Sequence, residues 1–226
     1  MVCSQNGCLL FSGCFNQNCL VAFSKLPLCY LSNSTRTAFD RAFGAEWPKL
    51  ELLVFDGYAG YNCDLVAGAP MDGKHYATLF AVLTAPISRV NVTIGSNSPG
   101  WLLDQEVAVA AFKAARSLFR VQAWQPVRVG SKAFPSANVT TCADILNLIR
   151  QSAPTPYHAS STCAMGKKDD PMAVIDDQAR VIGVHGLRVV HASSFPLLPP
   201  GHPQATVLFG SRRVSCHPMW FCSSRH

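Results

Sequence analysis

The hydrophobic and polar positions of the chain change period along its length and predict both strands and helices. Residues 51–55 (ELLVF) contain a short apolar run after Glu51, and residues 78–85 (TLFAVLTA) have the apolar character of a buried strand. In residues 90–94 (VNVTI) apolar and polar side chains alternate, which is the period of a half-buried strand. We predict that 78–85 and 90–94 pair as antiparallel strands, because a turn at Pro86 and Ser88 joins them.

Two later stretches have the period of a helix with one apolar face. Residues 104–120 begin with acidic and end with basic side chains, which matches the helix dipole. Their apolar face is formed by Val107, Ala111, Ala115, Leu118 and Phe119. A second helix is predicted after Thr141, with Asp144 as its capping-box partner, and we expect it to end before Pro154.

The two ends of the chain are less regular. Residues 1–24 have neither period, and we expect them to be irregular. Near the other end, residues 187–190 (LRVV) are apolar apart from Arg188, and we predict a strand that is covered on both faces. Residues 205–209 (ATVLF) have the composition of another helix or strand, but Gly210 and Pro218 predict that no regular element continues into the tail.

Composition narrows the classes of partner. Of the 226 residues, 49% are hydrophobic and only 14% are charged, so we expect a surface that a partner or further chain covers. The net charge of +6 is scattered without a basic stripe, and we expect no nucleic-acid partner. No apolar run approaches the ~20 residues that span a bilayer, so we expect no membrane partner either. The localisation stays open.

Several common chemistries lack their sequence patterns. The chain has ten cysteines but no C-x-x-C pair, so we expect neither a zinc site nor any other metal site. It has no G-x-S-x-G and no H-E-x-x-H motif, which argues against a serine hydrolase and a zinc protease. Cys163 is interpreted as a packed thiol, because no electropositive neighbour is evident.

Two histidines stand where loops meet regular elements, a common place for side chains held at a cleft. His158 lies in YHASSTCAMG (157–166) and His202 in PPGHPQATV (199–207). Imidazole accepts and releases a proton near neutral pH, so the pair is a candidate proton-handling site. From the residues alone, a purely structural role for both histidines stays open.

These two motifs and the stretch between them, AVIDDQARVIGVHGLRVVHASS (173–194), resemble the C-terminal signature of the glucose-methanol-choline (GMC) oxidoreductases. The similarity is strongest to fungal alcohol oxidases and dehydrogenases, including members from secondary-metabolite pathways. Weaker similarity reaches back to about residue 25. There, SRVNVTIGSN (88–97) and DQEVAVAAFKAAR (104–116) look like the sheet and following helix of the family's substrate domain.

The resemblance implies a mixed α+β fold, with an antiparallel substrate-domain sheet, helices, and the C-terminal strand and loop of an FAD-binding domain. Its N-terminal dinucleotide-binding unit is expected to be missing, because the chain contains no G-x-G-x-x-G. The implied division is an unassigned region at 1–24, part of the substrate domain at 25–150, a catalytic and FAD-contacting segment at 151–210, and an atypical tail at 211–226.

The implied function is FAD-dependent oxidation of a small-molecule alcohol, with hydride passing from the CH–OH group to flavin N5. His158 corresponds to the base that removes the hydroxyl proton, and His202 to a residue that hydrogen-bonds the substrate oxygen. The positions expected near the flavin are His191, Ala192, Pro203 and Gln204. At the first of these the family usually carries Asp, so the charge and size of that side chain differ here.

Three alternatives to a complete alcohol oxidoreductase follow from these departures. The chain is a non-catalytic truncated remnant or partial gene product of the family, or it is a half that acts only with a flavin-binding chain. Otherwise it is a lyase or cyclase relative on the same fold. A shortened passage at 95–106 (GSNSPGWLLDQE) and the unusual tail fit the first of these.

Overall fold

The computed structural model divides into two compact units, Met1–Pro154 and Thr155–His226. The residues that it describes are 3–4, 7–8, 12–13, 20–60, 70–88, 101–126, 128–130, 132–153 and 157–215. Within these residues, no helix combines the length and the apolar character needed to cross a membrane.

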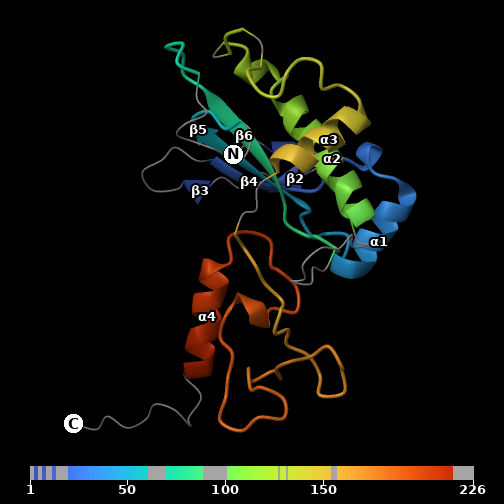
Figure 1. The fold of residues 1–226 in the computed structure, drawn as a ribbon, viewed down its shortest axis with the longest axis vertical. Coiled ribbons are helices and arrows are strands. Elements are labelled where there is room, and N and C mark those ends of the chain that lie inside the picture. Colours follow the sequence, from blue (N-terminus) through green and yellow to red (C-terminus); the bar gives the residue numbers. More distant parts are fainter. Residues whose placement is uncertain are drawn as a thin grey trace, which may run out of the picture. The chain divides into compact units, whose positions relative to one another are not determined.

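An antiparallel sheet forms the centre of the first unit (Figure 1). Its strand order is β3-β4-β5-β6, and β5 pairs with β6 along its whole length, from Leu50 opposite Leu83 to Asp56 opposite Ala77. The strands are β3 (Ser12–Gly13), β4 (Leu20–Ser24), β5 (Leu50–Asp56) and β6 (Ala77–Leu83), and a separate pair is formed by β1 (Cys3–Ser4) and β2 (Gly7–Cys8).

The strand predicted at 78–85 is confirmed as β6, although most of its residues are half-buried rather than buried. Among the described strands, its partner is β5. The predicted partner at 90–94 lies outside the described residues. The expectation that 1–24 is irregular is wrong for β4, which pairs with β5 over five residues. Its sequence LVAFS does not alternate, so the pairing rather than a local pattern defines this strand.

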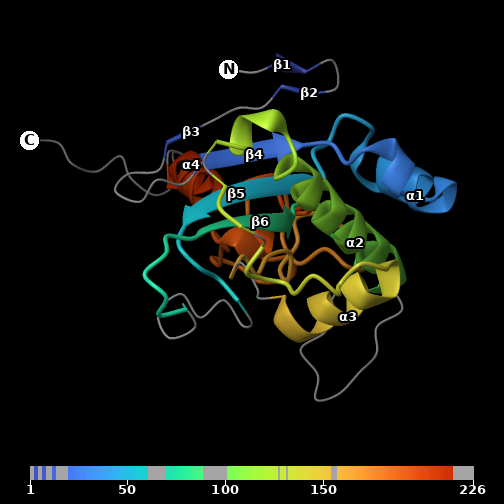
Figure 2. The ribbon, with the colours of Figure 1, turned by 90° about the horizontal axis from the view of Figure 1, so that it is seen from above.

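Within the described part of the first unit, the α-helices are α1 (Asn33–Phe43), α2 (Trp101–Leu118) and α3 (Cys142–Ser152). In the first unit α2 packs against β6, and α3 packs against α2 (Figure 2). The helix predicted at 104–120 is confirmed, with Val107, Ala111 and Ala115 buried as the pattern predicted. These residues join the core formed by the strands and by Phe39 of α1.

The second predicted helix is confirmed in its cap as well as its extent. The Thr141 side chain accepts a hydrogen bond from the Asp144 N–H, and the Asp144 side chain accepts one from the Thr141 N–H. This capping box satisfies backbone donors that would otherwise lack partners at the start of α3. The helix ends at Ser152, two residues before Pro154, as expected.

The second unit is built mainly from extended segments held by backbone hydrogen bonds, followed by the helix α4 (Gln204–Ser215). Residues 187–190 were predicted to be a strand covered on both faces. Among the described residues they form only a short antiparallel contact, in which Arg188 bridges Arg180, and Leu187 is 51% exposed. A strand covered on both faces needs elements packed above and below it, and the exposed side chains of Leu187 and Val190 lack such cover.

The prediction for residues after 209 also needs correction. Helix α4 continues through Gly210 and ends at Ser215, so the first residues of the predicted atypical tail are helical. An internal glycine lowers helix stability by about 1 kcal/mol relative to alanine, but it does not prevent the backbone hydrogen bonds that continue the helix. Pro218 lies outside the described residues.

Candidate active site

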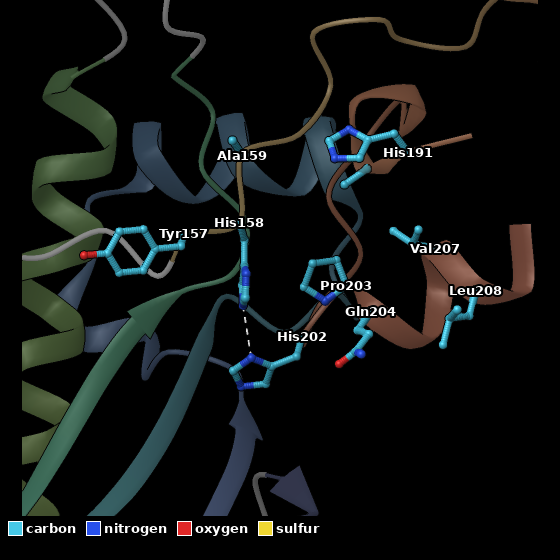
Figure 3. A pocket seen from close by; sticks show the side chains of 10 residues that line it. Tyr157, His158, Ala159, His191, His202, Pro203, Gln204, Val207 and Leu208 are labelled. Atoms are coloured by element: carbon cyan, nitrogen blue, oxygen red, sulfur yellow. Dashed lines mark hydrogen bonds between the residues drawn. The ribbon is translucent and has the colours of Figure 1, made fainter. Parts of the chain in front are cut away.

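The side chains of His158 and His202, 44 positions apart in the sequence, are hydrogen-bonded to each other. Nε2 of His158 lies 3.0 Å from Nδ1 of His202, and the rings meet edge to face with an interplanar angle of 87° (Figure 3). One ring must donate and the other must accept in such a contact. The contact between Nε2 of His158 and Nδ1 of His202 therefore contains one proton.

Backbone pairing fixes the segment that carries His158. The N–H groups of Ser161, Cys163 and Met165 donate to the carbonyl oxygens of residues 192, 193 and 194 at 3.2, 2.8 and 3.0 Å. Alternate N–H groups of one segment thus donate to three consecutive carbonyl groups of the other. As a result, the chain after His158 runs beside the short 3₁₀ turn η4 (Ala192–Ser194), which follows His191.

Two residues next to this pairing have left-handed backbone conformations. The φ angle is 60° at Tyr157 and 66° at Ser161, where most residues other than glycine are disfavoured. Such conformations persist where the surrounding contacts impose them, and they are enriched at functional sites. Here they lie on either side of His158, one residue before it and three residues after it.

His191 caps the 3₁₀ turn η4. Its Nδ1 accepts a hydrogen bond from the Ser193 N–H at 3.2 Å, and its backbone carbonyl accepts one from the Ser194 hydroxyl at 2.7 Å. A neutral ring that accepts at Nδ1 carries its proton on Nε2. The imidazole thus performs the capping role that an Asp carboxylate performs well at such positions.

His202 lies two residues before α4, where prolines interrupt regular structure. The carbonyl of Pro203 accepts a hydrogen bond from the Val207 N–H at 2.9 Å, which begins the helical pattern. Pro203 suits this position because it lacks an N–H, which the start of a helix could not satisfy internally. The beginning of α4 therefore fixes the backbone that carries His202.

An ion pair between the exposed Arg180 and the buried Asp176 stabilises the segment between the two motifs. The carboxylate of Asp176 accepts from the Arg180 guanidinium at 2.7 Å and from the backbone N–H groups of Gln178 and Arg180. Burial raises the pKa of Asp176, but these hydrogen bonds outweigh it and hold the pKa below its ordinary value. The turn packs next to Ile175, which is fully buried.

A pocket of about 380 Å³ opens beside the histidine pair. All six residues predicted from the sequence line it: His158, His202, His191, Ala192, Pro203 and Gln204. Figure 3 shows the two joined rings with Pro203 and Gln204 next to them. Their roles in catalysis and cofactor binding stay predictions.

Four other lining residues were not predicted: Tyr157, Ala159, Val207 and Leu208. The first two flank His158 directly, so proximity in the sequence was the available signal. The other two follow Gln204 by three and four positions on α4, the spacing that places residues on one face of a helix. This signal was missed because α4 was not predicted as a continuous helix.

A family model described as GMC oxidoreductase matches residues 84–210 of the chain. Patulin synthase of Aspergillus clavatus is 45% identical over 212 residues, covering 87% of this chain and 34% of the relative. Versicolorin B synthase of Aspergillus parasiticus is 37% identical over 209 residues, covering 88% of this chain and 31% of the relative. The chain belongs to the GMC oxidoreductase family, and it spans about a third of the length of these relatives.

Solved structures agree with this assignment. Pyridoxine 4-oxidase from Mesorbium loti superimposes with a TM-score of 0.60 at 25% identity, over 87% of this chain and 36% of that one. Formate oxidase superimposes with a TM-score of 0.67 at 20% identity, over 87% of this chain and 37% of that one, and shares the fold. The mixed α/β fold class predicted from the sequence is confirmed, and the family is one of FAD-dependent oxidoreductases.

Proposed function

We propose that the chain contributes the proton-accepting and substrate-facing part of an FAD-dependent enzyme that oxidises the CH–OH group of a small-molecule alcohol. The observation that carries this proposal is the 3.0 Å contact between His158 and His202 at a pocket. Membership of the GMC oxidoreductase family supports the reaction class.

The shared proton explains how the pair acts as a base. One proton lies between Nε2 of His158 and Nδ1 of His202, since two N–H groups facing each other would repel. In either tautomer one ring nitrogen outside this contact, Nδ1 of His158 or Nε2 of His202, keeps a lone pair that can take up the proton of a substrate hydroxyl. Removing that proton gives the oxygen alkoxide character and weakens the adjacent C–H bond toward hydride loss.

The residues around the pocket fit one part of FAD. Ala192, Pro203 and Val207 provide apolar lining beside the imidazoles, which suits the flat ring of a flavin. Gln204 and His191 add polar groups that can orient such a ring. When bound, FAD supplies the hydride acceptor. The chain has no G-x-G-x-x-G for the pyrophosphate, so the adenosine half would need residues other than this motif.

The first test is whether the purified chain binds flavin. Absorption in the visible flavin bands, as isolated or after FAD is added, would support a complete holoenzyme. Colourless protein after FAD addition would instead favour the non-catalytic alternative or a half that needs a flavin-binding chain. Titration with FAD in the presence of a separately expressed G-x-G-x-x-G domain from a homologous enzyme distinguishes the non-catalytic alternative from the half that needs a flavin-binding chain.

The second test addresses the histidines. With flavin bound, His158→Ala should lower kcat for aryl-alcohol oxidation, measured by dye reduction or peroxide release, by about 10²–10⁴-fold. His202→Ala should also lower kcat, while flavin absorption persists in both variants. His185→Asn is the matched control, because His185 is exposed and does not line the pocket. Unchanged turnover in His158→Ala would overturn the proposed role.

The same assay distinguishes the lyase or cyclase alternative. A redox enzyme consumes one acceptor molecule for each alcohol oxidised. Product formation without dye reduction or oxygen consumption would identify non-redox chemistry on this fold and contradict the proposal.

A further inference from the structure

Outside the histidine pocket, the first unit contains a contact between a nucleophilic and a cationic side chain. Nζ of Lys113, on α2, lies 3.0 Å from Sγ of Cys142, the first residue of α3, and donates a hydrogen bond to it. Cys142 is a free cysteine and is exposed. The two residues are 29 positions apart and meet because α2 and α3 pack against each other.

From this contact, we propose that Cys142 is a site of oxidative modification, which hydrogen peroxide converts to a sulfenic acid with the assistance of Lys113. The reacting group of a cysteine is its thiolate, and a neighbouring ammonium stabilises the negative charge on sulfur. Exposure of the side chain gives a small peroxide access to it.

The reaction balances with peroxide as the oxidant. The sulfur electron pair attacks one peroxide oxygen, so an S–O bond forms and the O–O bond breaks. Sulfur loses two electrons, and the other oxygen leaves as hydroxide, which takes a proton from solvent to become water. The ammonium of Lys113 also stabilises the charge that develops on the leaving oxygen, since it lies beside the sulfur.

Two charged side chains of α3 are hydrogen-bonded to groups other than this sulfur. Asp144, two positions after Cys142, directs its carboxylate to the backbone N–H groups of Thr140 and Thr141. Arg150 lies in the last turn of α3 and donates to Gln105. The position of the sulfur at the N-terminus of an 11-residue helix adds a smaller positive potential.

The chain contains its own comparison thiols. Cys29 is also free and exposed, but within the described residues no lysine is hydrogen-bonded to it. Cys163, the third free cysteine described, is half-buried. If exposure alone decided the rate, Cys29 and Cys142 would react alike.

The test exposes the folded full-length chain to limited peroxide and traps sulfenic acid with dimedone. Peptide mass spectrometry then gives the rate at each cysteine. Cys142 should be labelled faster than Cys29 and Cys163. Lys113→Gln should slow the labelling of Cys142 by about two- to fivefold, as expected of a charge contact between exposed groups. Lys113→Arg should retain most of the rate, and Cys142→Ser should remove the label.

Equal rates at Cys142 and Cys29 in the folded protein would overturn the proposal, and so would an unchanged rate at Cys142 in Lys113→Gln. A comparison in urea keeps the test decisive if that variant fails to fold. The faster labelling of Cys142 must disappear in the unfolded wild-type chain, because the contact with Lys113 depends on the packing of α2 against α3. An advantage that persists in urea would assign the rate to local sequence and contradict the role of Lys113.

Discussion

Glu106, in α2, forms hydrogen bonds with Thr35 in the first turn of α1, although 71 residues separate them in the sequence. Its carboxylate accepts from the Thr35 hydroxyl and also from the backbone N–H and the hydroxyl of Ser32, the N-cap of α1. Thr35 is fully buried. One acidic side chain therefore joins the start of one helix to the side of another.

Replacing this carboxylate should destabilise the first unit. We expect Glu106→Gln to lower the free energy of unfolding by about 1–3 kcal/mol. The amide oxygen accepts hydrogen bonds less strongly than a carboxylate, and the amide NH₂ group would face the hydrogen-bond donors of Ser32 and Thr35. Urea denaturation at neutral pH measures the change. Glu46→Gln is the matched control, since the Glu46 side chain is 91% exposed in its ion pair with Lys25 and should change stability little. A loss in the control equal to that in Glu106→Gln would contradict the prediction.

The same carboxylate should give stability a dependence on acid pH. Burial raises the pKa of Glu106, but the hydrogen bonds from Thr35 and Ser32 outweigh it and hold the pKa below its ordinary value. A lowered pKa in the folded state contributes stability that is fully present above the unfolded value and is lost as pH falls through the folded value. The difference in the free energy of unfolding between wild type and Glu106→Gln should therefore shrink as the pH falls. A constant difference between the two proteins from neutral to acid pH would count against this.

The capping box of α3 gives an independent prediction. Thr141→Ala removes the acceptor for the Asp144 N–H and should lower the free energy of unfolding by about 1 kcal/mol. Thr140→Ala is the control, since only the backbone N–H of Thr140 takes part, as a donor to Asp144. Thermal unfolding followed by circular dichroism distinguishes the two. Equal effects would show that the hydroxyl of Thr141 does not carry the cap.

Where the sequence predicted structure correctly, the information was local. The face of α2 and the cap of α3 follow from residues within one or two helical turns, such as Val107 with Ala111 and Thr141 with Asp144. Strand β4 depends instead on pairing with β5, 30 residues later, and its own residues do not alternate. Non-local pairing of this kind leaves little trace in a single sequence.

The site shows the same division. His158 and His202 were candidates from their places at loop ends, and motif similarity gave them roles and added His191, Ala192, Pro203 and Gln204. Their 3.0 Å contact joins residues 44 positions apart, and no periodicity indicates it or the nearby backbone pairing of 161–165 with 192–194. Val207 and Leu208 were missed because Gly210 was expected to stop α4. A propensity cost of about 1 kcal/mol at one position is smaller than the sum of the hydrogen bonds that continue a helix.

The left-handed residue after His158 offers a test of stored strain. Ser161 has φ of 66°, a conformation that costs a side chain roughly 1–2 kcal/mol and glycine much less. Ser161→Gly should therefore raise the free energy of unfolding by up to about 1 kcal/mol, after the greater freedom of glycine in the unfolded chain is subtracted. Ser160→Gly serves as control, because Ser160 is not among the residues with positive φ and should lose stability. A loss in both variants would show that the contacts of Ser161 outweigh its backbone strain.

The cap formed by His191 provides the last test, and it concerns the departure from the family's usual Asp. His191→Ala removes the acceptor for the Ser193 N–H and should lower the free energy of unfolding by about 1 kcal/mol. His191→Asp should restore that loss at neutral pH, because a carboxylate at an N-cap accepts the same hydrogen bond. Below the pKa of the new carboxyl group, the Asp variant should weaken toward the Ala variant, which urea denaturation across pH measures. If Asp were no better than Ala at neutral pH, the ring of His191 would be stabilising η4 through packing rather than through its nitrogen.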